Sequence, residues 1–294
     1  MQTASITREG SVYTKSARFD KGERRLSENE MRRLAPSIFA TEGHSSRSVK
    51  FAPIPTIEVL RKIAKEGFVP VGVKQSRSRD PGRAEFTKHL IRLRRLDGKQ
   101  RQVGDTVFEM LLTNANDGTA RYKLMAGLWR IRCMNSLVVL HEKLAATMIR
   151  HSGDAAEEVL DASFKVLELA DRTLACAENW GKVRLAEPER MSFARKAHKM
   201  RWHGKDYGVA SAVPPGKLLE ARRDGDLGSD LWTTFNVVQE NIIRGGLEGE
   251  GKDSCGRVTR YTSRPVNGID ADVTMNTELW ELADGLARKH GVLV

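Results

Sequence analysis

The sequence predicts an α+β fold: an antiparallel sheet with one basic face, covered on its other face by helices and followed by a helical C-terminal part. Between residues 68 and 139, short runs alternate apolar and polar side chains, which is typical of half-buried strands. From Asp154 onward, apolar residues recur at helical spacing instead. We expect three regions: a basic N-terminal arm over 1–50, an α+β sheet core over 51–150, and a helical region over 151–294 that packs on the core.

Charge and cysteine content limit the class of protein. The 294 residues include 49 Lys and Arg against 38 Asp and Glu, which gives a net charge of +11 and a pI near 9.7. This excess favours a polyanionic partner such as nucleic acid. The three scattered cysteines predict reduced thiols, and no apolar run approaches the ~18 residues of a membrane span. The N-terminus also lacks the apolar run of a secretory signal, so we expect a cytoplasmic protein with no membrane partner.

The first 50 residues are rich in Ser, Thr and Arg, and most of them predict an extended or disordered arm. One short helix is expected from Ser27 to Leu34, since Ser27 can cap it and Glu30 stands three residues further on. The arm either holds a nucleic-acid backbone or is a solvated tail, and both interpretations stay open.

The sheet core begins with a helix and two strands. Residues 55–67 predict the helix, which Thr56 can cap and Gly67 ends. Residues 68–74 alternate as a strand, and a basic loop with turn residues follows it. The next strand is expected from Lys88 to Arg95. On it, cations and apolar residues fall on opposite faces: Lys88, Arg92 and Arg94 against Ile91 and Leu93.

The densest β-pattern lies between residues 105 and 139. The strand Val107–Thr113 alternates, and residues 114–119 supply the Asn, Asp and Gly of a turn. The chain is extended again over 121–125, is expected to break at Gly127, and continues as a strand over 128–133. On that last strand, Trp129, Ile131 and Cys133 share an apolar face, and Arg130 and Arg132 share the other.

Helices dominate the rest of the chain. The first is expected over 154–180 and should cover the apolar face of the sheet. A basic helix follows Pro188, and a third runs over 230–244 between its cap, Asp230, and two glycines. A flexible, Gly-rich basic loop is expected near 245–267, before a last helix that Asn276 caps.

The positive charge gathers on the strands and their connecting loops. Like charges side by side on one face repel one another, so such a face is easier to explain if an anion neutralises it. The alternative is a solvated face without a ligand. We predict contacts with nucleic-acid phosphates for ten residues, in the strands and in the basic loop: Lys88, Arg92, Arg94, Arg121, Lys123, Arg130, Arg132, Arg77, Arg79 and Arg83.

Motifs for catalysis are weak. Residues 246–252 match the spacing of a phosphate-binding loop, but Asp253 replaces the hydroxyl residue that would hold magnesium. Asp270 and Asp272 are expected on one side of an extended segment, where a magnesium-dependent nuclease could use them. The histidines show no metal-binding spacing. We therefore predict no cofactor and assign no catalytic residue, and we leave enzymatic activity open.

Several sequence blocks, taken in their order along the chain, are distinctive: RDPGR at 79–83, TKH at 87–89, LTNANDGT at 112–119, GLWRIRCMNSLV at 127–138 and DLWTTF at 230–235. Segments 241–246 and 264–272 fit the same pattern. From about Ala35 onward, the chain resembles a phage- and plasmid-like family classed as a domain of unknown function (number 932), in particular its prophage-borne members. The resemblance implies a gene of a mobile element and carries over no catalytic residue.

The expected order of elements supports a second, looser resemblance. A helix ending near Gly67, antiparallel strands with a basic face and a covering helix are similar to the ring-forming single-strand annealing proteins of recombination. We therefore expect a nucleic-acid-binding protein, with single-stranded DNA as its partner and a homo-oligomer or ring as its assembly. Two alternatives stay open: an interaction protein that counteracts a host defence system, and a magnesium-dependent nuclease.

Overall fold

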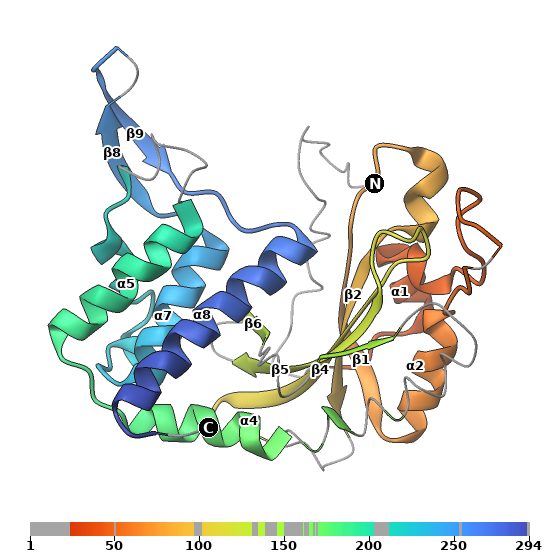
Figure 1. Cartoon of the computed structure of the whole chain (residues 1–294), viewed down its shortest axis with the longest axis horizontal. Helices are drawn as coiled ribbons and strands as arrows, with labels where there is room; N and C mark the ends of the chain where they lie inside the picture. The colour runs from red at the N-terminus through yellow and green to blue at the C-terminus, as the bar shows by residue number, and fades with distance from the viewer. Residues whose placement is uncertain are drawn as a thin grey trace.

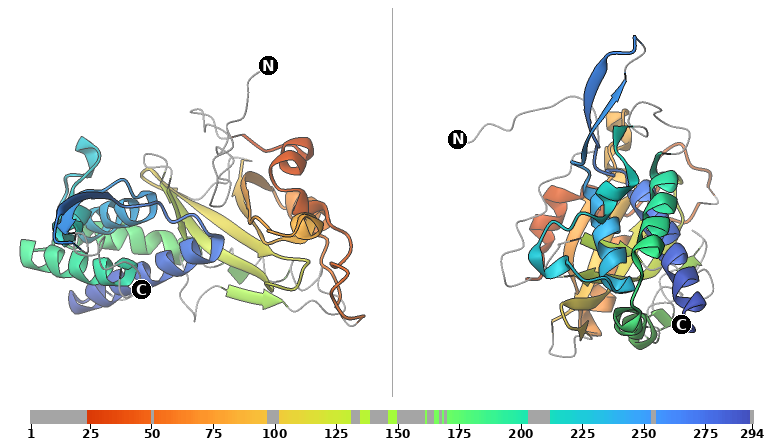
Figure 2. Two further views of the ribbon diagram at one scale, coloured as in Figure 1. Left: turned by 90° about the horizontal axis from the view of Figure 1, so that it is seen from above. Right: turned by 90° about the vertical axis from the view of Figure 1, so that its left-hand side faces the viewer.

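A computed structural model of the chain describes residues 24–49, 51–96, 102–130, 135–138, 146–149, 161, 165–166, 168, 170–202, 212–252 and 255–292. Antiparallel strands form a central sheet, which lies between α1 and α2 on one side and a group of helices on the other (Figure 1, Figure 2). This arrangement confirms the predicted α+β class with a helical C-terminal part.

The sheet has the strand order β1-β2-β4-β5-β6, with β3 paired to β4 and β7 paired to β5. Its strands are β1 (Phe68–Gln75), β2 (His89–Arg95), β3 (Gln102–Val103), β4 (Thr106–Asn114), β5 (Tyr122–Arg130), β6 (Asn135–Val138) and β7 (Ala146–Ile149). All nine residues of β4 are buried, so both faces of the central strand are covered. Strand β5 runs straight through Gly127, and the predicted break there is wrong because Gly127 pairs with Glu109.

Strand register decides which side chains share a face. Arg92 pairs with Leu111, and Val107 pairs with Trp129, so Arg92, Arg94, Glu109 and Trp129 lie on one side, called here the arginine face. Thr106 pairs with Arg130, which puts Arg130 on the opposite, apolar face. The predicted grouping of Arg92 and Arg94 with Lys88 is thus correct. The grouping of Arg130 with them is wrong, because Trp129 takes that place instead.

The apolar face packs against α2 (Thr56–Lys65), which buries Ile57, Leu60 and Ile63. The N-cap of α2 is Pro55 and makes no side-chain hydrogen bond, so Thr56 is not the cap that the sequence predicted. The helix predicted over 154–180 is described as α4 (Ala170–Lys182) and, before it, only at scattered positions. Its Leu174 and Ala177 belong to the same buried cluster as Phe108 and Leu128 of the apolar face.

The segment before α2 is more ordered than the predicted arm. Helix α1 (Glu28–Leu34) has the expected capping box, in which Ser27 and Glu30 bond to each other's backbone N–H groups. After it, η1 (Pro36–Phe39) buries Ile38 in the same core that holds Met31. Over residues 26–39, these apolar contacts replace the expected extended arm, whereas residues 41–49 form neither helix nor strand and are mostly exposed. The expectation for residues 1–23 lies outside the described part.

The helical part contains α4, α5 (Glu187–Trp202), η3 (Pro215–Leu219), η4 (Asp224–Asp226), α7 (Leu231–Arg244) and α8 (Ile269–Lys289). Four aromatic rings fill its centre: Trp180, Trp232, Phe235 and Trp280, with the centroids of Trp180 and Trp280 4.3 Å apart. Asp230 caps α7 as predicted, by accepting a hydrogen bond from Thr233 N. No helix among the described residues combines the length and the apolar character that crossing a membrane requires.

Two strands project from the helical part as a hairpin, β8 (Glu248–Lys252) and β9 (Val258–Thr262) (Figure 1). The sequence predicted a flexible loop here, and the pairing of Glu250 with Arg260 corrects that prediction. In β8, Gly249 and Gly251 alternate with charged residues. The missing side chain of Gly249 lets the backbone of Ala212 approach the strand, since a Cβ on Gly249 would lie 1.8 Å from Ala212 O.

Candidate nucleic-acid interface

One end of the sheet is built from two chain reversals. The β1–β2 connection contains η2 (Pro81–Phe86), and the β4–β5 connection contains Gly118 in a left-handed conformation. Ser76 N donates to Lys88 O at 2.7 Å, and Asp117 N donates to Phe86 O at 3.1 Å. Because backbone hydrogen bonds tie these connections to each other, the cations that they carry share one edge of the molecule.

Six of the predicted contact residues gather at this edge, called here the basic sheet end: Arg77, Arg79, Arg83, Lys88, Arg121 and Lys123. Arg77, Arg79 and Arg121 are exposed, and the other three are half-buried. Acidic neighbours are fewer: Asp80 lies 3.6 Å from Arg83 in an exposed pair, Asp270 pairs with Lys88 at 2.5 Å, and Glu85 of η2 is exposed. Exposed pairs of this kind contribute about 0–1 kcal/mol, so they leave the cations available to an anion.

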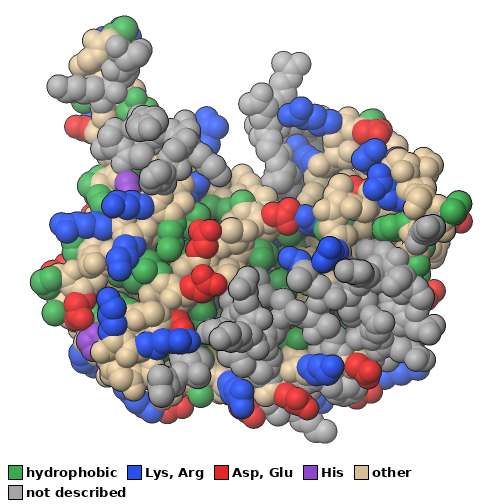
Figure 3. All heavy atoms as spheres, viewed as in Figure 1, with side chains coloured by type: hydrophobic (Ala, Val, Ile, Leu, Met, Phe, Trp, Pro, Cys, Tyr) green, Lys and Arg blue, Asp and Glu red, His purple; other side chains and the backbone are tan. Residues whose placement is uncertain are grey.

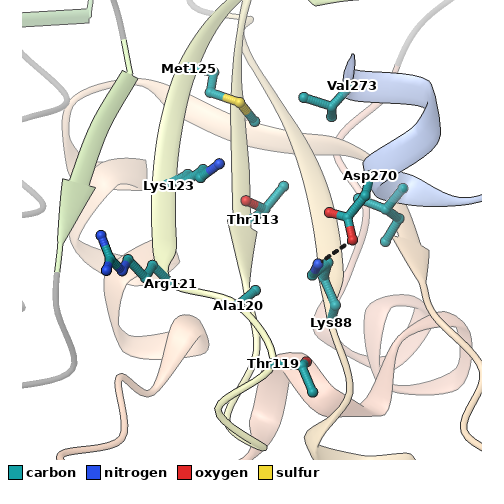
Figure 4. A pocket seen from close by; sticks show the side chains of 10 residues that line it. Lys88, Thr113, Thr119, Ala120, Arg121, Lys123, Met125, Asp270 and Val273 are labelled. Carbon is teal, nitrogen blue, oxygen red and sulfur yellow. Dashed lines mark hydrogen bonds and ion pairs between the residues drawn. The ribbon is translucent and has the colours of Figure 1, made fainter. Parts of the chain in front are cut away.

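A cavity of about 320 Å³ opens on the arginine face between the basic sheet end and the start of α8 (Figure 4). Its lining combines cations, hydroxyls and apolar groups: Lys88, Thr113, Thr119, Ala120, Arg121, Lys123, Met125, Ile269, Asp270 and Val273. In Figure 4, the ammonium of Lys123 points towards β4, Lys88 lies on the far side of that strand, and Met125 and Val273 lie at the other end. The sequence predicted the cations of this cavity but missed its apolar side.

A chain of hydrogen bonds holds α8 over the sheet. Lys74 Nζ donates to Asp272 Oδ2 at 2.8 Å, Asn276 Nδ2 donates to Asp272 Oδ1 at 2.8 Å, and Gln239 Nε2 donates to Asn276 Oδ1 at 2.7 Å. Asn276 and Gln239 are fully buried. This chain joins β1, α8 and α7. Asn276 thus lies inside α8, two turns after its start, and is not the N-cap that the sequence predicted.

The two candidate metal ligands lie in the first turn of α8, so the predicted extended segment is wrong. Residues two apart on a helix do not face each other, and each carboxylate has its own lysine: Lys88 for Asp270 and Lys74 for Asp272. Across the described residues, no group of three or more His, Cys, Asp or Glu side chains is arranged to hold a metal ion. Asp272 therefore helps to position α8 within the buried chain of hydrogen bonds, whereas the Asp270 carboxylate is largely exposed.

On the arginine face, Glu109 binds two of the predicted contact residues. Arg92 Nε and Nη2 donate to its carboxylate at 2.7 and 2.6 Å, and Arg94 Nε donates at 2.9 Å. The Arg92 guanidinium also lies over the Trp129 ring, 3.3 Å from its centroid. All three charged side chains are at least 93% buried. The sequence placed Arg92 and Arg94 on a phosphate-binding surface, but the structure buries them in an ion cluster.

Arg130 is buried in a second ion cluster, which joins the sheet to the helical part. Its Nε donates to Asp105 at 3.0 Å, and its Nη2 lies 2.6 Å from Asp226 of η4. Asp226 also pairs with Arg223, which contacts Glu240 of α7. The sequence predicted Arg130 as an exposed phosphate contact, so this prediction needs correction. Arg132 lies outside the described residues.

On the surface, too, the positive charge does not form one continuous basic face. In the view of Figure 3, the Lys and Arg side chains are interspersed with Asp and Glu over the described surface. A further cation, Arg47, lies against the β4–β5 turn, since a Cβ on Gly118 would meet its Nη1 at 2.7 Å. The predicted basic strand face is therefore reduced to a basic sheet end, which Arg47 extends.

Below the basic sheet end, His89 belongs to a buried polar network. Its Nδ1 lies 2.9 Å from Ser37 Oγ, its Nε2 lies 3.0 Å from Thr56 Oγ1, and Ser37 Oγ donates to Gln75 at 2.9 Å. Burial disfavours the charged imidazolium and lowers the pKa of His89 to about 3. This histidine therefore stays neutral and joins α2, η1 and β2.

The lowered pKa of His89 predicts a loss of stability in acid. The unfolded chain binds a proton near pH 6.5 that the folded protein excludes until about pH 3, so the contribution is complete above pH 6.5 and is lost as the pH falls. Between these values, His89 should lower the free energy of unfolding by about 1.4 kcal/mol per pH unit. Urea titrations from pH 7 to pH 4.5 should show a flatter dependence for His89→Gln. Equal slopes for both proteins would contradict the burial of a neutral His89.

The geometry defines an α+β protein whose sheet is covered on both faces and has a cationic cavity at one end. The chain belongs to the family described as Domain of unknown function (DUF932), which matches residues 43–280, and this confirms the resemblance noted in the sequence. It is 37% identical over 274 residues to UPF0380 protein YafZ of Escherichia coli (strain K12), and 36% identical over 274 residues to UPF0380 protein YfjQ of the same strain. Each alignment covers 92% of this chain and 95% of the relative. No solved structure matches the chain.

Proposed function

We propose that the chain binds nucleic acid through the basic sheet end, that single-stranded DNA is its preferred form, and that it serves a phage, plasmid or prophage in the cytoplasm. One observation carries the proposal: six cations from two chain connections and the strands beside them gather at one sheet end. Three of them, Lys88, Arg121 and Lys123, line a cavity together with one exposed carboxylate, Asp270. Lys and Arg that converge in this way bind phosphates and release counterions.

Two further features support a phosphate ligand over a solvated surface. The cations lie on connections that are fixed by hydrogen bonds to the sheet, so little conformational freedom is lost when they bind. In addition, Lys88 is 14% exposed, which is low for a lysine that serves solubility alone. Its ammonium lies at the cavity, where a phosphate oxygen can replace Asp270.

Fluorescence anisotropy with a labelled 20-nucleotide single strand and the matching duplex tests the proposal. At ~50 mM salt, we expect saturable binding of the single strand, and weaker binding of the duplex. Absence of binding to both at this salt concentration would overturn the proposal. Size-exclusion chromatography of the protein, alone and mixed with the same DNA, shows whether a homo-oligomer or ring forms.

The same experiment separates the two alternatives. Added magnesium should leave the strand intact, because Asp270 and Asp272 bind lysines. Nicking that requires magnesium and disappears in Asp270→Asn with Asp272→Asn would favour a nuclease instead. If DNA does not bind, an interaction protein that counteracts host defence becomes the better interpretation.

A further inference from the structure

The cavity at the start of α8 has two chemically different sides. Its cationic side carries Lys88, Arg121 and Lys123, together with the hydroxyls of Thr113 and Thr119. Its other side is apolar, where Met125, Ile269 and Val273 pack with Leu90 and Leu111 in a hydrophobic cluster of their own. A phosphate alone would need the first side only. A ligand that uses both sides must carry an anionic group and an apolar surface at a short distance from each other.

We propose that this cavity is the binding site for one unpaired nucleotide of a single strand, an inference that rests on the proposed nucleic-acid binding. The phosphate lies on Lys88 and Lys123, and the base lies against the apolar side of the cavity at Val273. The cavity volume of about 320 Å³ falls at the lower end of the ~300–1,000 Å³ of small-ligand sites. The apolar faces of a base suit this wall, since small-ligand sites are lined mostly by apolar side chains.

This site explains why a single strand should be preferred. A base in a duplex is paired and stacked, and it reaches such a cavity only after extrusion from the helix, which costs free energy. A base in a single strand enters without that cost. Cations outside the cavity, such as Arg77 and Arg79, contact either form equally, so the preference arises in the cavity itself.

Asp270 occupies the phosphate position in the free protein. Its Oδ2 lies 2.5 Å from Lys88 Nζ, while 78% of its side chain is exposed to solvent. A carboxylate that is held by one lysine and otherwise solvated is easily displaced. When a phosphate binds Lys88, the Asp270 carboxylate must move away or repel it. Removing this negative charge should therefore strengthen nucleotide binding without removing a contact to the ligand.

Two variants test the site with a labelled dT 12-mer, a 12-base-pair duplex and free dTMP as probes. Ala120→Leu with Val273→Leu narrows the cavity from both ends without changing charge, and we expect at least tenfold weaker binding of the 12-mer and unchanged binding of the duplex. Asp270→Asn should tighten binding of the 12-mer and of dTMP severalfold. The matched control is Ala271→Leu with Val258→Leu, which adds the same atoms at exposed positions outside the cavity and should change neither affinity.

Each outcome decides between the site and the wider function. If the narrowed cavity and Asp270→Asn both bind like the unaltered protein, the nucleotide site is wrong, although binding by the basic sheet end stands. If the unaltered protein binds neither strand form, the proposed function fails and the site with it. Thermal melts show whether the leucine variant is folded; if it is not, Asp270→Asn and dTMP decide, because the exposed Asp270 can be changed with little loss of stability.

Discussion

Replacing Glu109 with Gln should cost the protein about 3–5 kcal/mol of unfolding free energy, because the change removes a buried negative charge that pairs with two buried arginines. The carboxylate accepts hydrogen bonds from both Arg92 and Arg94 at the centre of a sheet whose two faces are covered. An amide of the same size keeps the shape of the core but supplies one acceptor and no charge. Urea denaturation of both proteins at neutral pH measures the difference.

Glu250→Gln is the matched control for this variant. Glu250 pairs with Arg260 at 3.5 Å on the projecting hairpin, and both side chains are exposed. The same substitution there should change the free energy of unfolding by no more than about 1 kcal/mol. If Glu109→Gln also stayed within that range, the buried ion cluster would not form in solution, and Arg92 and Arg94 would return as candidates for phosphate contacts.

Reversal of three charges at the basic sheet end should weaken binding of single-stranded DNA by more than tenfold at ~50 mM salt. The variant is Arg77→Glu with Arg79→Glu and Arg83→Glu, all in the β1–β2 connection. These side chains are exposed or half-buried, so stability should change by only about 0.5 kcal/mol for each substitution. Anisotropy titrations measure binding, and thermal melts confirm the fold.

A second triple on α5 controls for net charge. Arg195→Glu, Lys196→Glu and Lys199→Glu alter exposed residues and change the net charge by the same six units. Non-specific attraction between a basic protein and DNA would weaken equally in both triples. Binding at the basic sheet end requires a large loss for the first triple and a small loss for the second. An equal loss would contradict a localised interface.

The strand positions could be predicted because alternation of side chains is a local property. Register is not local, since a shift of one residue in the pairing exchanges the two faces of a strand. For this reason the faces of β2 were predicted correctly, while Arg130 was grouped with arginines that lie on the other side of the sheet. The same holds for the ion cluster around Glu109: the sequence showed that Glu109 shares a strand face with Val107 and Leu111, but its partners on other strands depend on register.

The two sides of the candidate site could be predicted from the sequence to different degrees. Its cations stand out because they flank turns, which lie at the surface. Its apolar side was missed because α8 was expected to begin at Asn276. A signal for the true start was present: Asp270 and Asp272 suit a first helical turn, and Ile269 and Val273 stand four residues apart, as on one face of a helix. No local pattern could show that this turn packs on β4 and β5.

The salt dependence of single-strand binding tests the central claim most directly. If the six cations of the basic sheet end neutralise phosphates, the logarithm of affinity should fall with the logarithm of salt concentration at a slope near −4, since each phosphate contributes about −0.7. If all ten cations predicted from the sequence took part, the slope would approach about −7. We expect the smaller value, because Arg92, Arg94 and Arg130 are bound to carboxylates. A slope near zero, or no binding at ~50 mM salt, would contradict nucleic-acid binding by the basic sheet end.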